Sequence, residues 1–359
     1  MINKNRLVKT FIELVKIDSP SGEEKKTAEE VAKRLQQLGA QVEFDSYGNV
    51  IGKIKGKGES IMLNAHLDTV EPGRSINPII TADRITSDGS TILGGDPKAG
   101  ITVILEAITS IIEDKKPHIP IEMVFTREEE SSLGGAINLN YRKINSKRGI
   151  VFDGDEDVHK IFVSSPTYYR LDATVIGRGA HAGVEPEKGI SAIQIASYII
   201  SKLKLGRIDH ETTVNIGVIS GGTARNAVPE KVELKGEIRS RDKKKLTRQI
   251  EQVESVFNKI QSNYPGSQIK IDLEEEFQGF KLKATHNTIQ FISRVLKTMS
   301  LEPELKDSGG GSDANIFHQH GIEVVVVGTG VYEPHTTREY TVIPQLYQAA
   351  QFCEKVLMA

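Results

Sequence analysis

The chain has 359 residues, which is long enough for two domains and a substantial hydrophobic core. Its 46 Lys and Arg nearly balance its 48 Asp and Glu, and no basic stripe interleaved with aromatic residues occurs, so we expect no nucleic-acid partner. The single cysteine, Cys353, excludes an intrachain disulfide and a thiolate cluster, and there is no apolar run of about 18 residues. We therefore expect a cytoplasmic protein without a membrane partner, in which any metal is held by His and carboxylates.

The first elements alternate between helical and strand patterns. Apolar residues at helical spacing over 7–15 predict a first helix, and a capping box over 21–24 predicts the start of a second. Strand patterns follow over 42–54 and 61–65. This alternation is typical of an α/β fold.

The strand over 61–65 ends in His66, and Asp68 follows two residues later. Residues two apart in a strand point to the same side, so Asp68 can support His66 from behind while His66 binds a metal. A His-x-Asp pair also arises by chance, so the prediction of a metal site depends on further candidate ligands downstream.

Asp96 and Pro97 begin a predicted helix after the loop over 71–95. Asp before Pro is also a common helix start that needs no functional explanation.

Further strands end in carboxylates or a histidine. The strand over 121–125 runs into three adjacent carboxylates, Glu128 to Glu130. They are either a solvated acidic turn or a helix N-terminus, where the helix dipole stabilises negative charge, or they are ligands that a cation keeps ionised. Another strand ends in Asp153, and His335 follows the apolar strand over 323–328. Because ligands bind at the carboxyl edge of α/β sheets, these endings together predict one site.

Between 169 and 276 the pattern changes to half-solvated antiparallel strands with two helices. One helix carries the apolar stripe Ile193, Ala196, Ile200 and Leu203, and Asp242 precedes the other as its N-cap. We therefore expect a catalytic domain over 1–168 plus 277–359 and a smaller α+β domain inserted over 169–276. The fold class is α/β, with a mixed, largely parallel sheet and flanking helices in the catalytic domain.

With these residues assembled, the sequence resembles the di-zinc peptidases and deacylases that include peptidase T, carboxypeptidase G and aminoacylase, and it is most similar to the peptidase T-like members. The resemblance implies the metal ligands His66, Asp96, Glu130, Asp153 and His335. It also implies that Asp96 bridges two ions, that Asp68 orients His66, and that Glu129 is the general base.

Three local departures or ambiguities accompany this assignment. The choice of Glu129 and Glu130 over Glu128 follows from the resemblance, although Ser132 stands where a glycine is common. Asp155 competes with Asp153, but the strand-end position favours Asp153. In the family, the bridging Asp is typically followed by a non-proline residue through a cis peptide, whereas this chain has Pro97 there. A cis peptide is much less unfavourable before proline, so we predict a cis Asp96–Pro97 bond.

The inserted domain holds the implied substrate contacts. His181 lies in a glycine-rich loop, where a histidine is usually solvent-facing, but the resemblance implies a lid residue that contacts the substrate carbonyl. The remaining implied substrate-binding residues are Arg225, Asn226, Arg239, Gly310 and Ser312. Arg239 could equally be an exposed strand charge. The resemblance also implies a homodimer through the inserted domain, and the sequence leaves open whether His181 serves its own site or a neighbour's.

The expected function is hydrolysis of short peptides by a tripeptide aminopeptidase-like enzyme. Two divalent ions sharing a carboxylate can activate water and polarise a carbonyl, and the oxygen and nitrogen ligands suit zinc, with cobalt or manganese as alternatives. Asp153, where carboxypeptidase-type relatives tend to carry Glu, favours the aminopeptidase. The alternatives are a carboxypeptidase or N-acyl amino acid deacylase, a non-catalytic peptide-binding protein, and a structural site with one metal.

Overall fold

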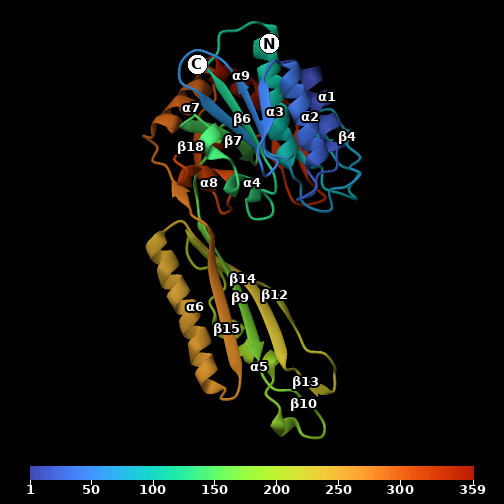
Figure 1. Ribbon diagram of the computed structural model, residues 1–359, viewed down its shortest axis with the longest axis vertical. Helices are drawn as coiled ribbons and strands as arrows, with labels where there is room; N and C mark the ends of the chain where they lie inside the picture. Colours follow the sequence, from blue (N-terminus) through green and yellow to red (C-terminus); the bar gives the residue numbers. More distant parts are fainter. The chain divides into compact units, whose positions relative to one another are not determined.

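The computed structural model describes residues 1–359, which divide into two compact units (Figure 1). The main unit comprises Met1–Val163, Leu282–Ser308 and Ser312–Ala359. The inserted unit comprises Ser164–Lys281 and Gly309–Gly311. The inserted unit therefore extends a few residues beyond both ends of the segment expected from the sequence, and it includes part of a distant glycine-rich loop.

A mixed sheet forms the centre of the main unit, with the strand order β1-β2-β6-β3-β7-β18-β8-β16 and with β17 paired to β8. Its strands are β1 (Gln41–Phe44), β2 (Val50–Ile54), β3 (Ile61–His66), β6 (Ile121–Thr126), β7 (Arg148–Gly154), β8 (Lys160–Ser165), β16 (Phe280–Lys281), β17 (Glu304–Asp307) and β18 (Glu323–Gly328). The four central strands β6, β3, β7 and β18 are parallel, while β1, β2, β8 and β16 pair antiparallel. This confirms the predicted α/β fold with a mixed, largely parallel sheet.

Helices pack against this sheet, and those over 4–15, 25–37, 95–113, 287–298 and 343–357 share one apolar core with it. The helices of the main unit are α1 (Lys4–Val15), α2 (Lys25–Gln37), α3 (Gly95–Glu113), α4 (Gly134–Ile137), α7 (Asn287–Thr298), α8 (Asp313–Gln319), α9 (Ile343–Leu357) and the 3₁₀ turn η1 (Tyr141–Lys143). Helix α3 lies on β3 and β7 and also contacts α1 and α9. Along β3, Ile61, Leu63 and Ala65 enter this core, so Asn64 and His66 point to the other face.

The loop expected over 71–95 contains two short strands that the sequence pattern did not reveal. Together with strands near the C-terminus they form a sheet in the order β19-β20-β5-β4. These strands are β4 (Ile79–Ile80), β5 (Arg84–Thr86), β19 (Val331–Tyr332) and β20 (Tyr340–Val342). This small sheet therefore ties the segment before α3 to the segment that carries His335.

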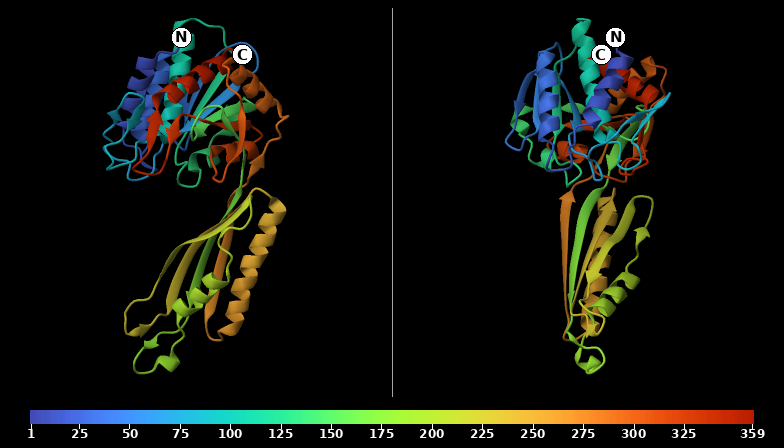
Figure 2. Two further views of the ribbon diagram at one scale, coloured as in Figure 1. Left: turned by 180° about the vertical axis from the view of Figure 1, so that it is seen from behind. Right: turned by 90° about the vertical axis from the view of Figure 1, so that its right-hand side faces the viewer.

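The inserted unit is an antiparallel sheet in the order β11-β12-β14-β9-β15, with a separate β10-β13 pair (Figure 2). Its elements are β9 (Thr167–Ile176), β10 (Ala180–His181), η2 (Pro186–Lys188), α5 (Ala192–Lys202), β11 (Gly206–Arg207), β12 (Thr212–Gly221), β13 (Ala227–Val228), β14 (Lys231–Ser240), α6 (Lys243–Asn263) and β15 (Gln268–Phe277). Helices α5 and α6 contact each other and both contact β14, and their buried residues share one core with the sheet, so they cover one face of it.

Two predictions about these helices have different outcomes. The cap of α6 is confirmed, because the Asp242 side chain accepts the N–H of Lys245 at 2.9 Å. The stripe of α5 is confirmed for Ala196, Ile200 and Leu203, which pack in the core of the inserted unit, but it is wrong for Ile193, which is 42% exposed, while Ile195 and Ile199 are buried in its place. A helix rich in apolar residues on several sides offers more than one plausible stripe, and only contact with the sheet selects one.

None of the helices combines the length and the apolar character that crossing a bilayer requires.

Candidate metal centre

His66 is the last residue of β3, between the parallel neighbours β6 and β7, and it is 2% exposed. Its Nε2 atom lies 2.9 Å from Oδ1 of Asp96 and 3.0 Å from Oδ1 of Asp153. Its other nitrogen, Nδ1, lies 3.3 Å from Oδ1 of Asp68. One ring nitrogen thus faces two carboxylates while the other faces a supporting carboxylate, as in metal sites with an oriented histidine.

A second group forms around the other oxygen of Asp96. His335 Nε2 lies 3.3 Å from Asp96 Oδ2 and 2.8 Å from Glu130 Oε1. The ligand atoms within each group, His66 with Asp96 and Asp153, and Asp96 with Glu130 and His335, all lie within 4.8 Å of one another. The structure therefore brings the five candidate ligands into two groups that share Asp96.

The backbone around Asp96 departs from a regular helix start. Gly94 has the left-handed φ of 71°, and Asp96 has non-helical angles, φ −82° and ψ 109°. The Asp96–Pro97 peptide is cis, which confirms the prediction made from the sequence. The Asp96 carboxylate faces the two histidines, so the interpretation of this residue as a simple helix cap does not account for its contacts.

The three adjacent glutamates have different surroundings. Glu128 accepts the Tyr47 hydroxyl at 2.6 Å and lies 3.2 Å from the Arg127 guanidinium. Glu129, 9% exposed, groups with His66 and Glu130 through atoms within 4.8 Å. The turn after them includes Ser132 at φ 76°, a left-handed conformation that favours glycine. Glu128 is thus engaged elsewhere, and Ser132 occupies a position whose backbone explains the usual glycine.

Asp68 is fully buried and connects these segments. It accepts the N–H of Glu129 at 2.9 Å, the N–H of Glu130 at 3.2 Å and the hydroxyl of Ser21 at 2.6 Å. The capping box expected at 21–24 is therefore wrong, since α2 has no side-chain cap and Ser21 binds Asp68 instead. A serine that reaches a residue far along the chain cannot be told from a cap by local spacing.

The electrostatics of the cluster favour cations. Burial raises the pKa of Glu129 well above its usual range, and burial together with Asp96 raises the pKa of Asp153 to about 8. Burial also opposes ionisation of Asp96, but hydrogen bonds from His335 and His66 outweigh it and lower the pKa of that carboxyl. Two imidazoles do not neutralise the buried carboxylates, so a divalent cation fits this donor set. Nitrogen and oxygen donors without sulfur suit zinc, cobalt or manganese.

Comparisons with known proteins show that the chain is similar to peptidases. Residues 49–162 match the model of peptidase family M28, and residues 167–265 match the peptidase dimerisation domain of the M20 type. The crystal structure of aminopeptidase PepT from Bacillus cereus is 37% identical, with a TM-score of 0.90 over 99% of this chain and 98% of that chain. A tripeptidase structure from Staphylococcus aureus is 35% identical, with a TM-score of 0.95 over 100% and 98% of the two chains. An uncharacterized Bacillus subtilis protein, YqjE, is 36% identical over 99% of both chains.

The chain belongs to the peptidase T-like M20 metallopeptidases. This confirms the resemblance seen in the sequence. The M28 match covers the part of the main unit that carries His66, Asp96 and Glu129, so these residues lie in a segment shared between peptidase families.

In this metallopeptidase, four of the implied substrate contacts lie in the 164–281 segment of the inserted unit. His181 on β10 pairs with Ala227 on β13, and the N–H of Ala182 donates to the carbonyl of Asn226 at 2.9 Å, which brings the His181 and Asn226 segments together. Arg225 is exposed. Arg239 donates to Glu237 at 2.9 Å and lies over the Tyr168 ring, so its guanidinium already has partners within the sheet. Their role toward a substrate stays a prediction.

The two remaining implied contacts lie in the glycine-rich loop before α8. The carbonyl of Gly310 accepts the Ser165 hydroxyl at 2.8 Å within the inserted unit. Ser312 caps α8 in a capping box with Asn315 and is 8% exposed. The hydroxyl of Ser312 thus has a structural role in the helix start, and its role toward a substrate also stays a prediction.

Sequence reasoning missed two buried carboxylates near the ligands of the metallopeptidase. Glu339 accepts backbone N–H groups from the segment before α3, and burial raises its pKa to about 7. Asp313, at the start of α8, is bonded to the Thr126 hydroxyl and lies 3.4 Å from Asn64 Nδ2. Asp313 directly follows Ser312 of the glycine-rich loop, so the sequence motif could have identified it as a candidate site residue. Glu339 has no motif of its own beyond its position four residues after His335.

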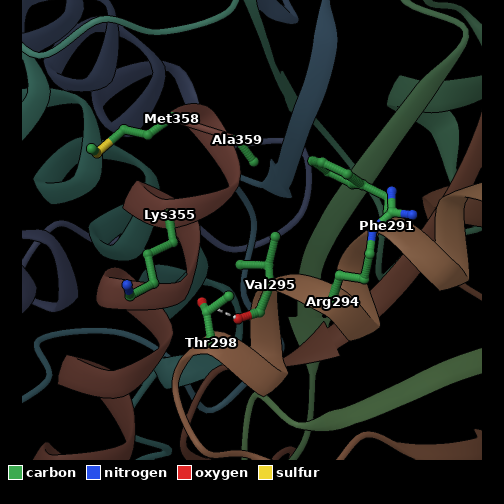
Figure 3. A pocket seen from close by; sticks show the side chains of 7 residues that line it. All are labelled: Phe291, Arg294, Val295, Thr298, Lys355, Met358 and Ala359. Carbon is green, nitrogen blue, oxygen red and sulfur yellow. Dashed lines mark hydrogen bonds between the residues drawn. The ribbon is translucent and has the colours of Figure 1, made fainter.

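A separate pocket of about 480 Å³ lies between α7 and α9 (Figure 3). It is lined by Phe291, Arg294, Val295, Thr298, Lys355, Met358 and Ala359. Its lining contains no imidazole or side-chain carboxylate, so it lacks the donors of a metal centre.

Proposed function

We propose that this metallopeptidase is an aminopeptidase that cleaves tripeptides with the help of two divalent ions, for which zinc is the first candidate. The observation that carries the proposal is the sharing of Asp96 between two ligand groups, one with His66 and Asp153 and the other with Glu130 and His335. Over nearly the whole chain, more than a third of the residues are identical to those of an aminopeptidase and of a tripeptidase. This similarity supports both the aminopeptidase reaction and a tripeptide substrate.

The proposed mechanism gives each residue a separate task. The two ions, when bound, lower the pKa of a water molecule and polarise the carbonyl of the scissile bond. A carboxylate oxygen of Glu129 accepts the proton of the attacking water and returns it to the nitrogen of the leaving amine, a contribution of about 10²–10⁴ in rate. Asp68 accepts from His66 Nδ1, which leaves Nε2 as the metal-binding atom.

The inserted unit supplies the proposed substrate contacts. The similarity of residues 167–265 to a peptidase dimerisation domain supports a role in dimerisation. We propose that the inserted unit also serves as a lid. His181 would donate to the substrate carbonyl oxygen as charge develops there. Arg225, Asn226 and Arg239 would hold the peptide backbone and its carboxylate, and Gly310 and Ser312 would border the same substrate.

We also propose a homodimer that forms through the inserted unit and acts in the cytoplasm. Strand β11 covers only Thr213 and Val214 of the outer edge of β12, so the rest of that edge lacks a strand neighbour within the chain. Val218 and Ile219 on this edge are 49% and 52% exposed. An unpaired edge with exposed apolar residues is suited to pairing with a second copy.

Glu129→Gln and Glu128→Gln, compared side by side, test the reaction and the assignment of the base. Each variant and the wild type are assayed on tripeptides with a free N-terminus, on N-acetylated tripeptides and on N-acyl amino acids, before and after chelation. We expect wild type to cleave only free tripeptides, to lose activity on chelation and to regain it with zinc. Glu129→Gln should lose at least 10²-fold in kcat, whereas Glu128→Gln should stay within a few-fold.

Other results would contradict specific parts of the proposal. Release of only the C-terminal residue would make the enzyme a carboxypeptidase, and turnover of N-acyl amino acids alone would make it a deacylase. Full activity of Glu129→Gln would remove Glu129 as the base. Metal binding without turnover of any of these substrates would favour a peptide-binding protein or a structural metal site.

A further inference from the structure

Glu339 is a buried carboxylate, 1% exposed, whose two oxygens are both occupied by backbone N–H groups. Oε2 accepts the N–H of Leu93 and the N–H of Gly94, each at 2.8 Å, and Oε1 accepts the N–H of Asp96 at 3.0 Å. No cationic side chain pairs with Glu339, so these three amides provide the stabilisation of its carboxylate. A buried carboxylate satisfied by backbone donors fixes the segment that supplies them, because leaving either side unpaired is unfavourable.

The three amides belong to the short segment that presents Asp96 to both ligand groups. This segment is packed tightly as well as hydrogen-bonded: a Cβ at Gly95 would lie 2.7 Å from Thr341 Oγ1 and 3.0 Å from Glu339 Oε1. Glu339 immediately precedes β20, and His335 lies four residues earlier. Residues 335–339 therefore begin with His335, a candidate ligand of one group, and end with Glu339. We call the three hydrogen bonds from the backbone at 93–96 to Glu339 the clamp, because they hold the segment of the shared ligand Asp96.

We propose that Glu339 is a positioning residue for the metal centre: it holds the backbone at 93–96 so that Asp96 directs one oxygen to each ligand group. Glu339 does not touch the metal-binding atoms and acts only through Asp96. This inference rests on the proposed two-metal function, because a shared ligand must satisfy two positions and tolerates displacement less well than a ligand of one ion.

Glu339→Gln interrupts the clamp with little change in shape. A glutamine offers only one acceptor oxygen, so its NH₂ group must face either the Asp96 N–H or the N–H groups of Leu93 and Gly94. At least one amide then meets a donor instead of an acceptor. Glu122→Gln is the control, since Glu122 is 3% exposed and accepts the N–H of Asn145 and of Ser146 at 2.9 and 2.7 Å, and it differs from Glu339 in also pairing with Lys53 at 3.1 Å. Glu122 lies near the start of β6, at the end of the strand opposite the ligands.

Three measurements on the full chain separate positioning from general stability. Amide hydrogen exchange of the metal-free proteins reports on the clamp itself, titration with zinc gives dissociation constants, and steady-state assays at saturating zinc give kcat and KM. For Glu339→Gln we expect faster exchange at 93–96, a 10–100-fold weaker zinc affinity and a lower kcat with little change in KM. For Glu122→Gln we expect faster exchange near Asn145 and Ser146 with wild-type zinc affinity.

Wild-type exchange at 93–96 together with wild-type zinc affinity in Glu339→Gln would overturn the inference, as would an equal loss of affinity in both variants. If Glu339→Gln does not fold, Glu339→Asp keeps the charge but withdraws it by one methylene, and the same pattern is expected. If the wild type itself binds no divalent ion, the proposed function fails, whereas the exchange data still decide whether Glu339 holds the segment.

Discussion

The backbone N–H of Glu129 donates to Asp68 Oδ1 at 2.9 Å, and that same oxygen lies 3.3 Å from Nδ1 of His66. One buried carboxylate therefore fixes both the ring of a candidate ligand and the turn that carries the proposed base. The arrangement links residues from two separate strands, β3 and β6, at the carboxyl edge of the sheet, where α/β folds place their ligands.

Asp68→Asn should weaken metal binding and turnover together. An asparagine amide has one acceptor oxygen for the groups that Asp68 now serves, and it carries no charge to stabilise the His66 ring. We expect zinc affinity and kcat each to fall about 10–100-fold, measured by zinc titration and by tripeptide hydrolysis at saturating metal.

Asp45→Asn is the control for this variant, because Asp45 is 8% exposed and accepts the N–H groups of Tyr47, Gly48 and Asn49. It should lower the free energy of unfolding without changing zinc affinity. Equal effects of the two variants on zinc binding would mean that Asp68 is only a structural acceptor.

Gly100→Ala should disturb the ends of two ligand-bearing strands. A Cβ at Gly100 would lie 2.0 Å from the carbonyl oxygen of Phe152 and 3.1 Å from the Cβ of Ala65, the residues immediately before Asp153 and His66. We expect a loss of about 1–3 kcal/mol in the free energy of unfolding, measured with denaturant, because a backbone atom cannot yield as a flexible side chain does. Gly309→Ala has open space around its Cβ and should leave the free energy of unfolding nearly unchanged. Wild-type stability of Gly100→Ala would show that α3 can move away from β7 at little cost.

Ser132→Gly should stabilise the protein and keep its activity. Ser132 has φ 76°, a conformation that costs a non-glycine residue about 1–2 kcal/mol, while glycine adds about 0.4–1 kcal/mol of entropy to the unfolded chain. The expected net gain in the free energy of unfolding is about 0.5–1 kcal/mol. Ser131→Gly, at a position without a left-handed φ, should instead destabilise. A loss of stability in Ser132→Gly would indicate that the serine side chain stabilises the turn.

Val218→Lys should weaken the proposed homodimer. The charge would lie on the unpaired edge of β12, where lysine is unfavourable for pairing with another strand. Sedimentation of wild type over a range of concentrations should show a dimer, and the variant should shift toward monomer. Val184→Lys, at a 69% exposed valine outside β12, should sediment as wild type does. A monomeric wild type, or an unchanged Val218→Lys dimer, would rule out this interface.

Much of the site was predictable because its residues stand at strand ends. His66, Asp153 and the glutamates each follow an apolar strand pattern, and the carboxyl ends of parallel strands meet at one edge of a sheet. The Asp96–Pro97 cis bond was predictable for a local reason as well, since proline makes the cis form accessible. The choice among Glu128, Glu129 and Glu130 required the family resemblance, because three adjacent carboxylates have no distinguishing local pattern.

The sequence by itself determined the α/β class, the insertion and the residue types available to a metal, because periodicity and composition are local properties of the chain. Only the tertiary structure decided that Ser21 supports Asp68, that Glu339 clamps the Asp96 segment and that Ile195 rather than Ile193 enters the core of the inserted unit. These contacts join residues distant in sequence or select among equivalent local patterns. Their partners are set by packing, and no spacing along the chain encodes which buried donor will meet which acceptor.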